Sequence, residues 1–282
     1  MSDVPMITLN DGNEIPQLGF GVWQVPAEDT AEAVAKALDV GYRHIDTAEM
    51  YENEQGVADG LREAGVDRDE VFITSKLNNG DHEPDDARRA IETTLEKLGT
   101  RHVDLFLIHW PLPSRYGGDF VQTWKALESF KADGLARSIG VSNFQTHHLD
   151  VLAEQCDVTP AVNQIEIHPY MLNHAVAGYN ESLGIVTEAW SPLASGELIE
   201  EPRIEHIAER LGKTVPQVVL RWHIQKGYVI FPKSVTPERI EENFEIFDFE
   251  LTDEDVATIE ELDKGEDGRT GPNPDTFDYV PS

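Results

Sequence analysis

The feature of this sequence that most constrains its fold is a repeated alternation of short buried strands with amphipathic helices. Seven apolar runs rich in β-branched residues have the length and composition of buried strands. They occupy residues 44–48, 71–77, 103–110, 136–143, 162–168, 185–190 and 228–235, and residues 18–22 form an eighth candidate at the start. Apolar positions recur at helical spacing between several of them, at 31, 34, 35 and 38 before Gly41, at 87, 91, 95 and 98 before Gly99, and at 120, 124 and 127. This alternation predicts a parallel sheet with crossover connections.

Two architectures hold eight parallel strands, an open doubly wound sheet and a closed barrel. No Gly-x-Gly-x-x-Gly sequence follows an early strand and no change in composition marks a domain boundary, which disfavours the open sheet. The 282 residues fit a (β/α)₈ barrel of about 250 residues with additions at both ends. These additions are a hairpin over residues 6–15, with Asp11-Gly12 as its turn, and an irregular tail over residues 263–282. We therefore predict an α/β fold, a single (β/α)₈ TIM barrel domain spanning residues 1–282, with an N-terminal β-hairpin and an irregular C-terminal tail.

The charge of the chain excludes several kinds of partner. With 53 Asp and Glu against 22 Lys and Arg, the net charge is −31, which disfavours nucleic acids and anionic membranes because both bind positive faces. No apolar run approaches the roughly 18 residues of a membrane helix. The first five residues have neither the basic region nor the apolar core of a secretory signal, and the single cysteine, Cys156, cannot form an internal disulfide. We expect a cytoplasmic protein.

The acidic residues recur on nearly every polar segment instead of forming one tail. A net charge of about 2–8 in magnitude keeps a small domain soluble, and −31 exceeds that need. In molar salt the Debye length falls to ~3 Å, so that self-repulsion within the compact state is largely screened. The composition therefore predicts a salt-adapted, halophilic protein with an acidic surface.

Four polar residues near the ends of the first strands form the candidate catalytic site. Active sites of (β/α)₈ barrels lie at the C-terminal ends of the strands, where Asp46, Lys76 and His109 stand, and Tyr51 follows the second strand. A phenol has an ordinary pKa near 10, and a neighbouring ammonium lowers that pKa. An aspartate would hold the lysine, and a histidine would hydrogen-bond a carbonyl group. Each residue alone fits a cap, a surface charge or a core position, but the converging set predicts proton transfer.

A second group of residues, at the ends of later strands, fits a nucleotide. Thr236 and Pro237 predict a helix start, with threonine as cap and proline at the first helical position. Lys233 and Arg239 flank it, so the helix N-terminus and two cations predict an anion site. Hydroxyl, amide and indole groups come from Ser142, Asn143, Gln164, Trp190 and Ser191. Amides pair with another carboxamide and an indole stacks on a flat ring, so the group as a whole predicts a nicotinamide dinucleotide.

A metal-dependent barrel hydrolase is the alternative for the same strands. Its potential ligands are His44, Asp46, His109, Glu166 and His168. The sequence lacks a His-x-His pair, and His44 and Asp46 share one strand face. Glu166 and His168 would also need to share a face that points inward. We therefore favour the nucleotide site over a metal centre.

Six segments, in this order, resemble the aldo-keto reductase family. They are GYRHIDTA (residues 41–48) with Tyr51, TSKL (74–77), DLFLIHWP (104–111), GVSNF (140–144), NQIEIHPY (163–170) and IFPKS (230–234). Each alone is a moderate signal, whereas six in order over essentially the whole chain are a strong one. Within the family, the chain is most similar to bacterial and archaeal reductases of the 2,5-diketo-gluconate reductase type.

The resemblance implies an NADPH-dependent enzyme that reduces aldehydes and ketones to alcohols. It implies a catalytic tetrad of Asp46, Tyr51, Lys76 and His109. In this scheme Tyr51 protonates the carbonyl oxygen as hydride arrives from C4 of the nicotinamide, and His109 orients the carbonyl group. The Asp46–Lys76 pair tunes the phenol. The family implies no metal and a monomer, and the alternative is a regulatory barrel that senses the cofactor with negligible turnover.

The same resemblance implies the cofactor contacts. The nicotinamide carboxamide contacts fall on Ser142, Asn143 and Gln164, and the stacking partner falls on Trp190, where tyrosine or phenylalanine is more usual. The pyrophosphate and adenosine contacts fall on Ser191, Leu193, Ser195, Lys233, Ser234, Val235, Glu242 and Asn243. The 2′-phosphate contacts fall on Lys233, Ser234, Thr236 and Arg239. Because a guanidinium binds a phosphate bidentately, NADPH is expected in preference to NADH.

The substrate cleft departs from the family pattern at one position. The family often reads Lys-Leu-Trp-Asn where this chain has Asn78 after Lys76-Leu77, and a polar side chain there argues against a preference for aromatic substrates. The expected substrate contacts are Trp23, Met50, Asn78 and Trp110. From the family we also expect the tail, with Phe277 and Tyr279, to fold over the mouth of the barrel.

Overall fold

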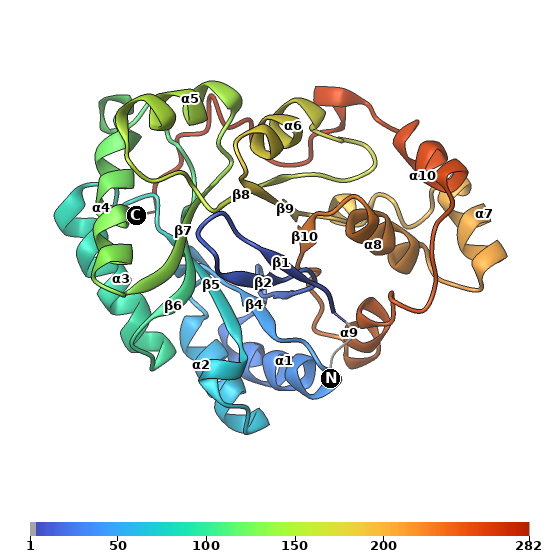
Figure 1. The fold of residues 1–282 in the computed structure, drawn as a ribbon. Helices are drawn as coiled ribbons and strands as arrows, with labels where there is room; N and C mark the ends of the chain where they lie inside the picture. The colour runs from blue at the N-terminus through green and yellow to red at the C-terminus, as the bar shows by residue number, and fades with distance from the viewer. Residues whose placement is uncertain (1–3, 282) are drawn as a thin grey trace.

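Eight parallel strands form a barrel in the computed structural model, which describes residues 4–281 (Figure 1). The strands are β3 (Phe20–Gly21), β4 (His44–Asp46), β5 (Phe72–Leu77), β6 (Val103–Ile108), β7 (Ala136–Ser142), β8 (Val162–Glu166), β9 (Val186–Trp190) and β10 (Val229–Ile230). They pair in chain order from β3 to β10, and a parallel bridge between Leu18 and Ile230 joins the two edges. The predicted barrel is confirmed. The last strand is shorter than predicted because Pro232, which has no N–H to donate, soon follows it.

Helices surround the barrel on its outer face (Figure 1). They are α1 (Ala27–Val40), α2 (Glu54–Ala64), α3 (Pro84–Leu98), α4 (Phe120–Ala132), α5 (Thr146–Gln155), α6 (His174–Ser182), α7 (Pro202–Leu211), α8 (Val215–Gln225), α9 (Pro237–Phe244) and α10 (Asp253–Glu260). Gly41 and Gly99 end α1 and α3 with positive φ angles of 127° and 63°, as their positions predicted. None of the helices in residues 4–281 has the length and apolar character needed to cross a lipid bilayer.

The N-terminal hairpin covers the end of the barrel at which the strands begin. Its strands β1 (Met6–Thr8) and β2 (Glu14–Pro16) pair in antiparallel fashion, as predicted. Leu9 and Ile15 belong to one buried cluster with Leu105, Leu107 and Val229 of the barrel strands. Burial of each such side chain stabilises the fold by roughly 1.5–3 kcal/mol. The polar side chains of the candidate site lie at the opposite end, where the strands terminate.

The C-terminal tail crosses the mouth of the barrel. After the short 3₁₀ turn Gly265–Gly268 it has no regular structure, and Figure 1 shows it running past α6 to an end beside α4. The amide and hydroxyl of Thr270 both donate to Glu166 Oε1 at 2.6 Å. At Gly271, an added Cβ would lie 2.3 Å from the Trp190 ring, so any other residue would force the ring or the tail to shift.

The end of the tail is held by three further contacts. The ring of Phe277 lies 4.2 Å from that of Trp110, between centroids. Asn79 Nδ2 donates to the carbonyl oxygen of Tyr279 at 2.9 Å, and Arg115 Nε donates to that of Asp278 at 3.0 Å. The tail therefore covers part of the mouth, as the family resemblance led us to expect.

Candidate active site

The structure brings Asp46, Tyr51, Lys76 and His109 together at the strand ends. Asp46 ends β4, Lys76 lies near the end of β5, His109 follows β6, and Tyr51 comes from the 3₁₀ turn Glu49–Tyr51. Lys76 Nζ donates to Asp46 Oδ1 at 2.7 Å and to the carbonyl oxygen of Thr47 at 2.8 Å, and it lies 3.4 Å from the Tyr51 hydroxyl. The Tyr51 and His109 rings meet edge to face with centroids 5.7 Å apart. A carboxylate, an ammonium, a phenol and an imidazole thus lie close together.

The Asp46–Lys76 pair is buried, and burial acts on the pKa of each partner. Lys76 has no exposed surface; desolvation lowers its pKa, but interactions led by the charge of Asp46 outweigh this and keep the pKa above its ordinary value. Burial raises the pKa of Asp46, while Lys76 and a hydrogen bond from Gln164 oppose that rise. Lys76 is therefore an ammonium at neutral pH, placed beside the phenol.

The pKa of Tyr51 differs from the sequence-based prediction. Burial raises its pKa above the ordinary value of 10, and Lys76 offsets only part of that rise, whereas we had predicted a net lowering. The reason is that the low-dielectric surroundings disfavour the phenolate more than one ammonium at 3.4 Å stabilises it. The phenol of Tyr51 consequently keeps its proton throughout the neutral range.

The imidazole of His109 is neutral. Burial lowers its pKa well below the ordinary value, and the charge of Lys76 lowers it further. Its Nδ1 is buried and has no hydrogen-bond partner within the described chain. Its carbonyl oxygen accepts a hydrogen bond from Asn143 Nδ2 at 3.0 Å, which ties β6 to β7 at the mouth. A neutral imidazole can orient a carbonyl group by a hydrogen bond, but it has no acidic proton to deliver at neutral pH.

The predicted carboxamide contacts form one hydrogen-bonded group at the ends of β7 and β8. Asn143, which has a φ of 64°, accepts a hydrogen bond from Trp190 Nε1 at 2.8 Å through Oδ1. Ser142 Oγ donates to the carbonyl oxygen of Gln164 at 2.9 Å. Gln164 Nε2 donates to Asp46 Oδ2 at 2.9 Å, so this group and the tetrad are joined. These bonds fix the plane of the indole and the positions of the amides.

The predicted anion site lies where α9 begins. Pro237 is the first residue of α9, but the Thr236 hydroxyl makes no capping bond; instead Ser234 Oγ accepts the amide N–H of Thr236 at 3.1 Å. Lys233 and Arg239 are exposed. Neither forms an ion pair with any residue in 4–281, although most other Lys and Arg side chains do. These two cations are available to an external anion.

The remaining predicted cofactor residues follow β9, precede α9 or lie in the last turn of α9. Ser191 and Leu193 are partly buried and Ser195 is exposed, and two of these three, Ser191 and Ser195, have positive φ angles. Val235 is exposed and Asn243 is buried. Glu242 accepts a hydrogen bond from Thr214 at 2.6 Å, so its carboxylate is engaged within the protein. Because β9 and β10 are neighbours in the barrel, both segments lie at one side of the mouth.

The predicted substrate contacts differ widely in exposure. Trp23 is 50% exposed, whereas Trp110 is buried beneath Phe277 of the tail. Met50 and Asn78 are partly buried, and Asn78 Oδ1 has no hydrogen-bond partner among the described residues.

Three polar residues support the site in ways that sequence reasoning did not predict. Asn53 accepts from Thr47 and donates to the carbonyl oxygens of Val22 and Val25, which ties the loop carrying Trp23 to the tetrad. Glu166 anchors the tail. Glu188 lies fully buried on β9 and accepts from Gln164. The one signal for Glu188 was an acid within an apolar strand, in phase with Trp190.

The ligands of the alternative hydrolase do not converge. His44 Nε2 lies 3.1 Å from Thr74 Oγ1, and His168 pairs with Glu166 below the tail. Across residues 4–281, the group of three or more close potential ligands is a different one, His147 and His148 of α5 with Asp275 of the tail. There His148 Nδ1 accepts the Gln145 N–H at 3.1 Å, so its Nε2 carries the proton and faces Asp275 at 3.6 Å. This suits a contact that holds the tail and does not suit a metal.

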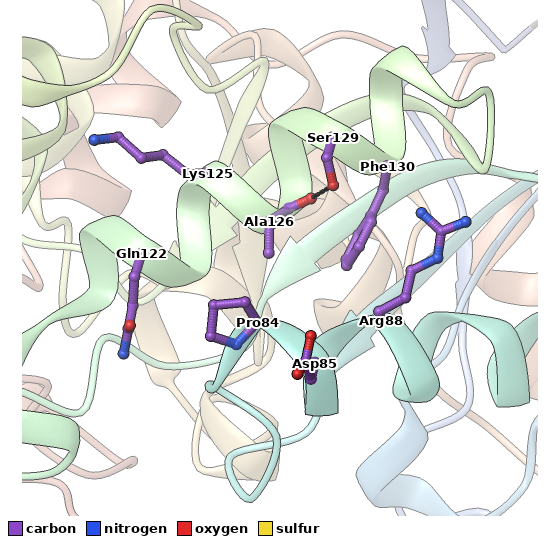
Figure 2. A pocket seen from close by; sticks show the side chains of 8 residues that line it. All are labelled: Pro84, Asp85, Arg88, Gln122, Lys125, Ala126, Ser129 and Phe130. Atoms are coloured by element: carbon purple, nitrogen blue, oxygen red, sulfur yellow. Dashed lines mark hydrogen bonds between the residues drawn. The ribbon is translucent and has the colours of Figure 1, made fainter.

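A separate depression of about 520 Å³ lies between α3 and α4, away from the strand ends (Figure 2). It is lined by Pro84, Asp85, Arg88, Gln122, Lys125, Ala126, Ser129 and Phe130. Arg88 lies over the Phe130 ring and pairs with Glu92 and Asp133. No predicted site residue lines this depression, and it is not part of the candidate active site.

Comparison with known proteins agrees with this geometry. The family model described as the aldo/keto reductase family matches residues 17–264. An aldo-keto reductase of Mycolicibacterium smegmatis is 50% identical, and the methylglyoxal reductase DkgA of Escherichia coli K12 is 46% identical; each match covers 98% of this chain and 99% of the relative.

Solved structures give the same result. The crystal structure of Gox0644 is 42% identical with a TM-score of 0.94, covering 99% of this chain and 100% of that one, and a mutant of Gox0644 was crystallised with NADPH. The family and enzyme class expected from the six motifs are confirmed. The chain belongs to the aldo/keto reductase family.

Proposed function

We propose that this protein reduces small aldehydes and ketones to alcohols with NADPH, and that Tyr51 is the general acid. The observation that carries the proposal is the position of Lys76 Nζ, 2.7 Å from Asp46 and 3.4 Å from the Tyr51 hydroxyl, at the mouth of a barrel of this family. A buried phenol beside a permanent ammonium can give up a proton at the moment of reaction and leave a stabilised phenolate.

The tetrad residues have separate tasks in this scheme. Bound NADPH supplies a hydride to the carbonyl carbon. Tyr51 donates its proton to the carbonyl oxygen, which thereby becomes a hydroxyl group, and Lys76 stabilises the phenolate that remains. Asp46 keeps Lys76 charged in its buried position. His109, which is neutral, orients the carbonyl oxygen by a hydrogen bond.

The residues around the mouth fit this cofactor. The indole of Trp190 is held in a fixed plane by Asn143 and offers a face for the nicotinamide ring. Lys233 and Arg239, exposed and free of ion pairs within the described chain, suit the 2′-phosphate that distinguishes NADPH from NADH. The contacts of the pyrophosphate and adenosine are proposed for Ser191, Leu193, Ser195, Lys233, Ser234, Val235, Glu242 and Asn243.

For the substrate, we propose a small 2-oxoaldehyde or a similar short dicarbonyl compound. Relatives that are 46–48% identical over nearly the whole chain are methylglyoxal reductases, which act on a compound of this class. Asn78 offers a polar group where the family often has an indole, and Trp23, Met50 and Trp110 supply apolar walls. We further propose that the protein is adapted to high salt, because its net charge is −31. We also propose that it works in the cytoplasm as a monomer.

The experiment is to follow NADPH absorbance with methylglyoxal, short aldehydes and ketones. We expect NADPH oxidation that depends on the carbonyl substrate and is far slower with NADH. Binding of NADPH without oxidation by any carbonyl in the panel would instead support the regulatory alternative.

A further inference from the structure

Glu188 is a buried acid beside the candidate active site that no step above uses. It has no exposed surface, and its Oε2 accepts a hydrogen bond from Gln164 Nε2 at 2.7 Å. Its other oxygen, Oε1, is buried and has no hydrogen-bond partner among residues 4–281. The charged groups that act on it are Asp46 of β4 and Lys76 of β5, and it forms no ion pair in that part of the chain. Burial of an acid without a paired cation is destabilising, which singles this residue out.

The amide of Gln164 is fixed by two carboxyl groups. Its Nε2 donates to Asp46 Oδ2 at 2.9 Å and to Glu188 Oε2 at 2.7 Å, so both amide hydrogens are used. Turning the amide over would lose both of these N–H bonds and would place its oxygen against the carboxylate of Asp46, which has no proton to donate. With only one of the two acceptors the amide could rotate about its remaining bond. Two acceptors therefore select one orientation of the Gln164 amide.

In this orientation the side-chain oxygen of Gln164 differs from those of Ser142 and Asn143, each of which already accepts a hydrogen bond within the described chain. Asn143 uses Oδ1 for Trp190 Nε1 and Nδ2 for Ser142 and the carbonyl oxygen of His109. Ser142 Oγ donates to the main-chain carbonyl oxygen of Gln164, not to its side chain. Gln164 Oε1 accepts no hydrogen bond from the part of the chain that the structure describes, so it can receive an N–H from a ligand.

We propose that Glu188 is a positioning residue, which turns the Gln164 amide so that its oxygen accepts a hydrogen bond from the carboxamide N–H of the bound nicotinamide. This inference rests on the proposed function. It assigns to Glu188 an effect on cofactor binding that acts through Gln164, without direct contact with cofactor or substrate.

The test compares two cofactors that differ only in the carboxamide NH2, which is a methyl group in the second. Dissociation constants of NADPH and of reduced 3-acetylpyridine adenine dinucleotide phosphate, whose acetyl group has no N–H, are measured by fluorescence titration. The variants are Glu188→Met, which removes the acceptor at similar volume, and Glu188→Gln, which keeps an oxygen acceptor. Glu181→Gln, an exposed acid on α6, is the matched control for loss of one charge.

We expect Glu188→Met to weaken NADPH binding about tenfold, as loss of one hydrogen bond predicts, and to leave binding of the acetyl analogue unchanged. Glu188→Gln and Glu181→Gln should both keep the wild-type ratio of the two dissociation constants. Equal weakening of both cofactors by Glu188→Met, or no weakening of either, would overturn the inference.

A second measurement covers the case in which Glu188→Met does not fold. Glu188→Gln must then retain the wild-type ratio, and a ratio near one in that variant would overturn the inference. Failure of the wild-type protein to bind NADPH is a different result, because it would remove the proposed function itself. A wild-type protein that binds NADPH normally while the ratio is insensitive to Glu188 would remove only this inference.

Discussion

The two ends of the candidate site are built in opposite ways. At the tetrad, Lys76 has no exposed surface and bonds to Asp46 and Thr47, and the hydrogen bonds continue through Gln164 to Glu188. At the start of α9, Lys233 and Arg239 are exposed and form no ion pair within residues 4–281. One end is a buried hydrogen-bond network within the protein, and the other is a pair of exposed cations.

Because of this difference, we expect the buried end to determine the reaction and the exposed end to determine the affinity for the cofactor. A buried network takes its geometry from folding, so removal of one member leaves another polar group unpaired and affects stability as well as reaction. Exposed cations are solvated and mobile, so their removal changes the binding of an anion and little else. Substitutions at the two ends should therefore have different signatures.

The largest expected effect is on turnover by Tyr51→Phe. Loss of the phenolic proton should lower kcat by about 10²–10⁴-fold, the usual contribution of general acid catalysis. The dissociation constant of NADPH should stay within twofold of wild type, because the ring remains. Stopped-flow turnover and fluorescence titration measure the two quantities, and turnover above a tenth of wild type would show that Tyr51 is not the acid.

Lys76→Met should destabilise the protein, because it leaves Asp46 buried without its cation. The expected loss in the free energy of unfolding is about 3–5 kcal/mol, measured by urea denaturation. The double variant Asp46→Asn with Lys76→Met should recover part of this loss, since no charge is then stranded. Equal stability of the single and double variants would mean that the pair is not coupled.

Glu188 should give the buried end a distinctive pH dependence. Burial, with a smaller contribution from Asp46, raises the pKa of Glu188 to about 8, whereas the unfolded chain has 4.5. The native state then binds the proton more tightly, so the stability from this group is complete below pH 4.5 and is lost as the pH rises through 8. Relative to Glu188→Gln, the wild-type free energy of unfolding should fall by up to about 1.4 kcal/mol per pH unit in this window. A constant difference between the two proteins from pH 5 to 8 would contradict this.

At the exposed end, Arg239→Gln should weaken NADPH binding by about 10–100-fold and leave NADH binding unchanged, since charge-assisted hydrogen bonds to phosphate contribute about 1.5–3 kcal/mol. The melting temperature should not change. Lys125→Gln, an exposed cation on α4, is the control for net charge. Equal weakening of NADPH and NADH would place Arg239 away from the 2′-phosphate.

Much of the barrel and the tetrad could be predicted from the sequence because both depend on local patterns. The strand–helix alternation, Gly41 and Gly99 each act over a few residues, and the order of strands then brings Asp46 and Lys76 to one end. Other features arise only from the folded chain. The raised pKa of Tyr51 comes from burial by surrounding elements, and the bonds between Thr270 and Glu166 join residues 104 positions apart.

The smallest expected effect is that of salt on stability. A single change of solvent should act on the charged surface and leave the buried end of the site nearly unaffected. At a net charge of −31, surface repulsion destabilises the folded state in dilute buffer, and a Debye length of ~3 Å at 1 M KCl screens it. We expect a gain of about 1 kcal/mol, or roughly 2–4 °C in melting temperature, between 0.1 and 2 M KCl. The buried Asp46–Lys76 pair is screened far less, so kcat at saturating NADPH and substrate should stay within twofold over the same range. Sorbitol at matched osmolality separates charge screening from surface exclusion, and a melting temperature that stays flat or falls with KCl would contradict salt adaptation.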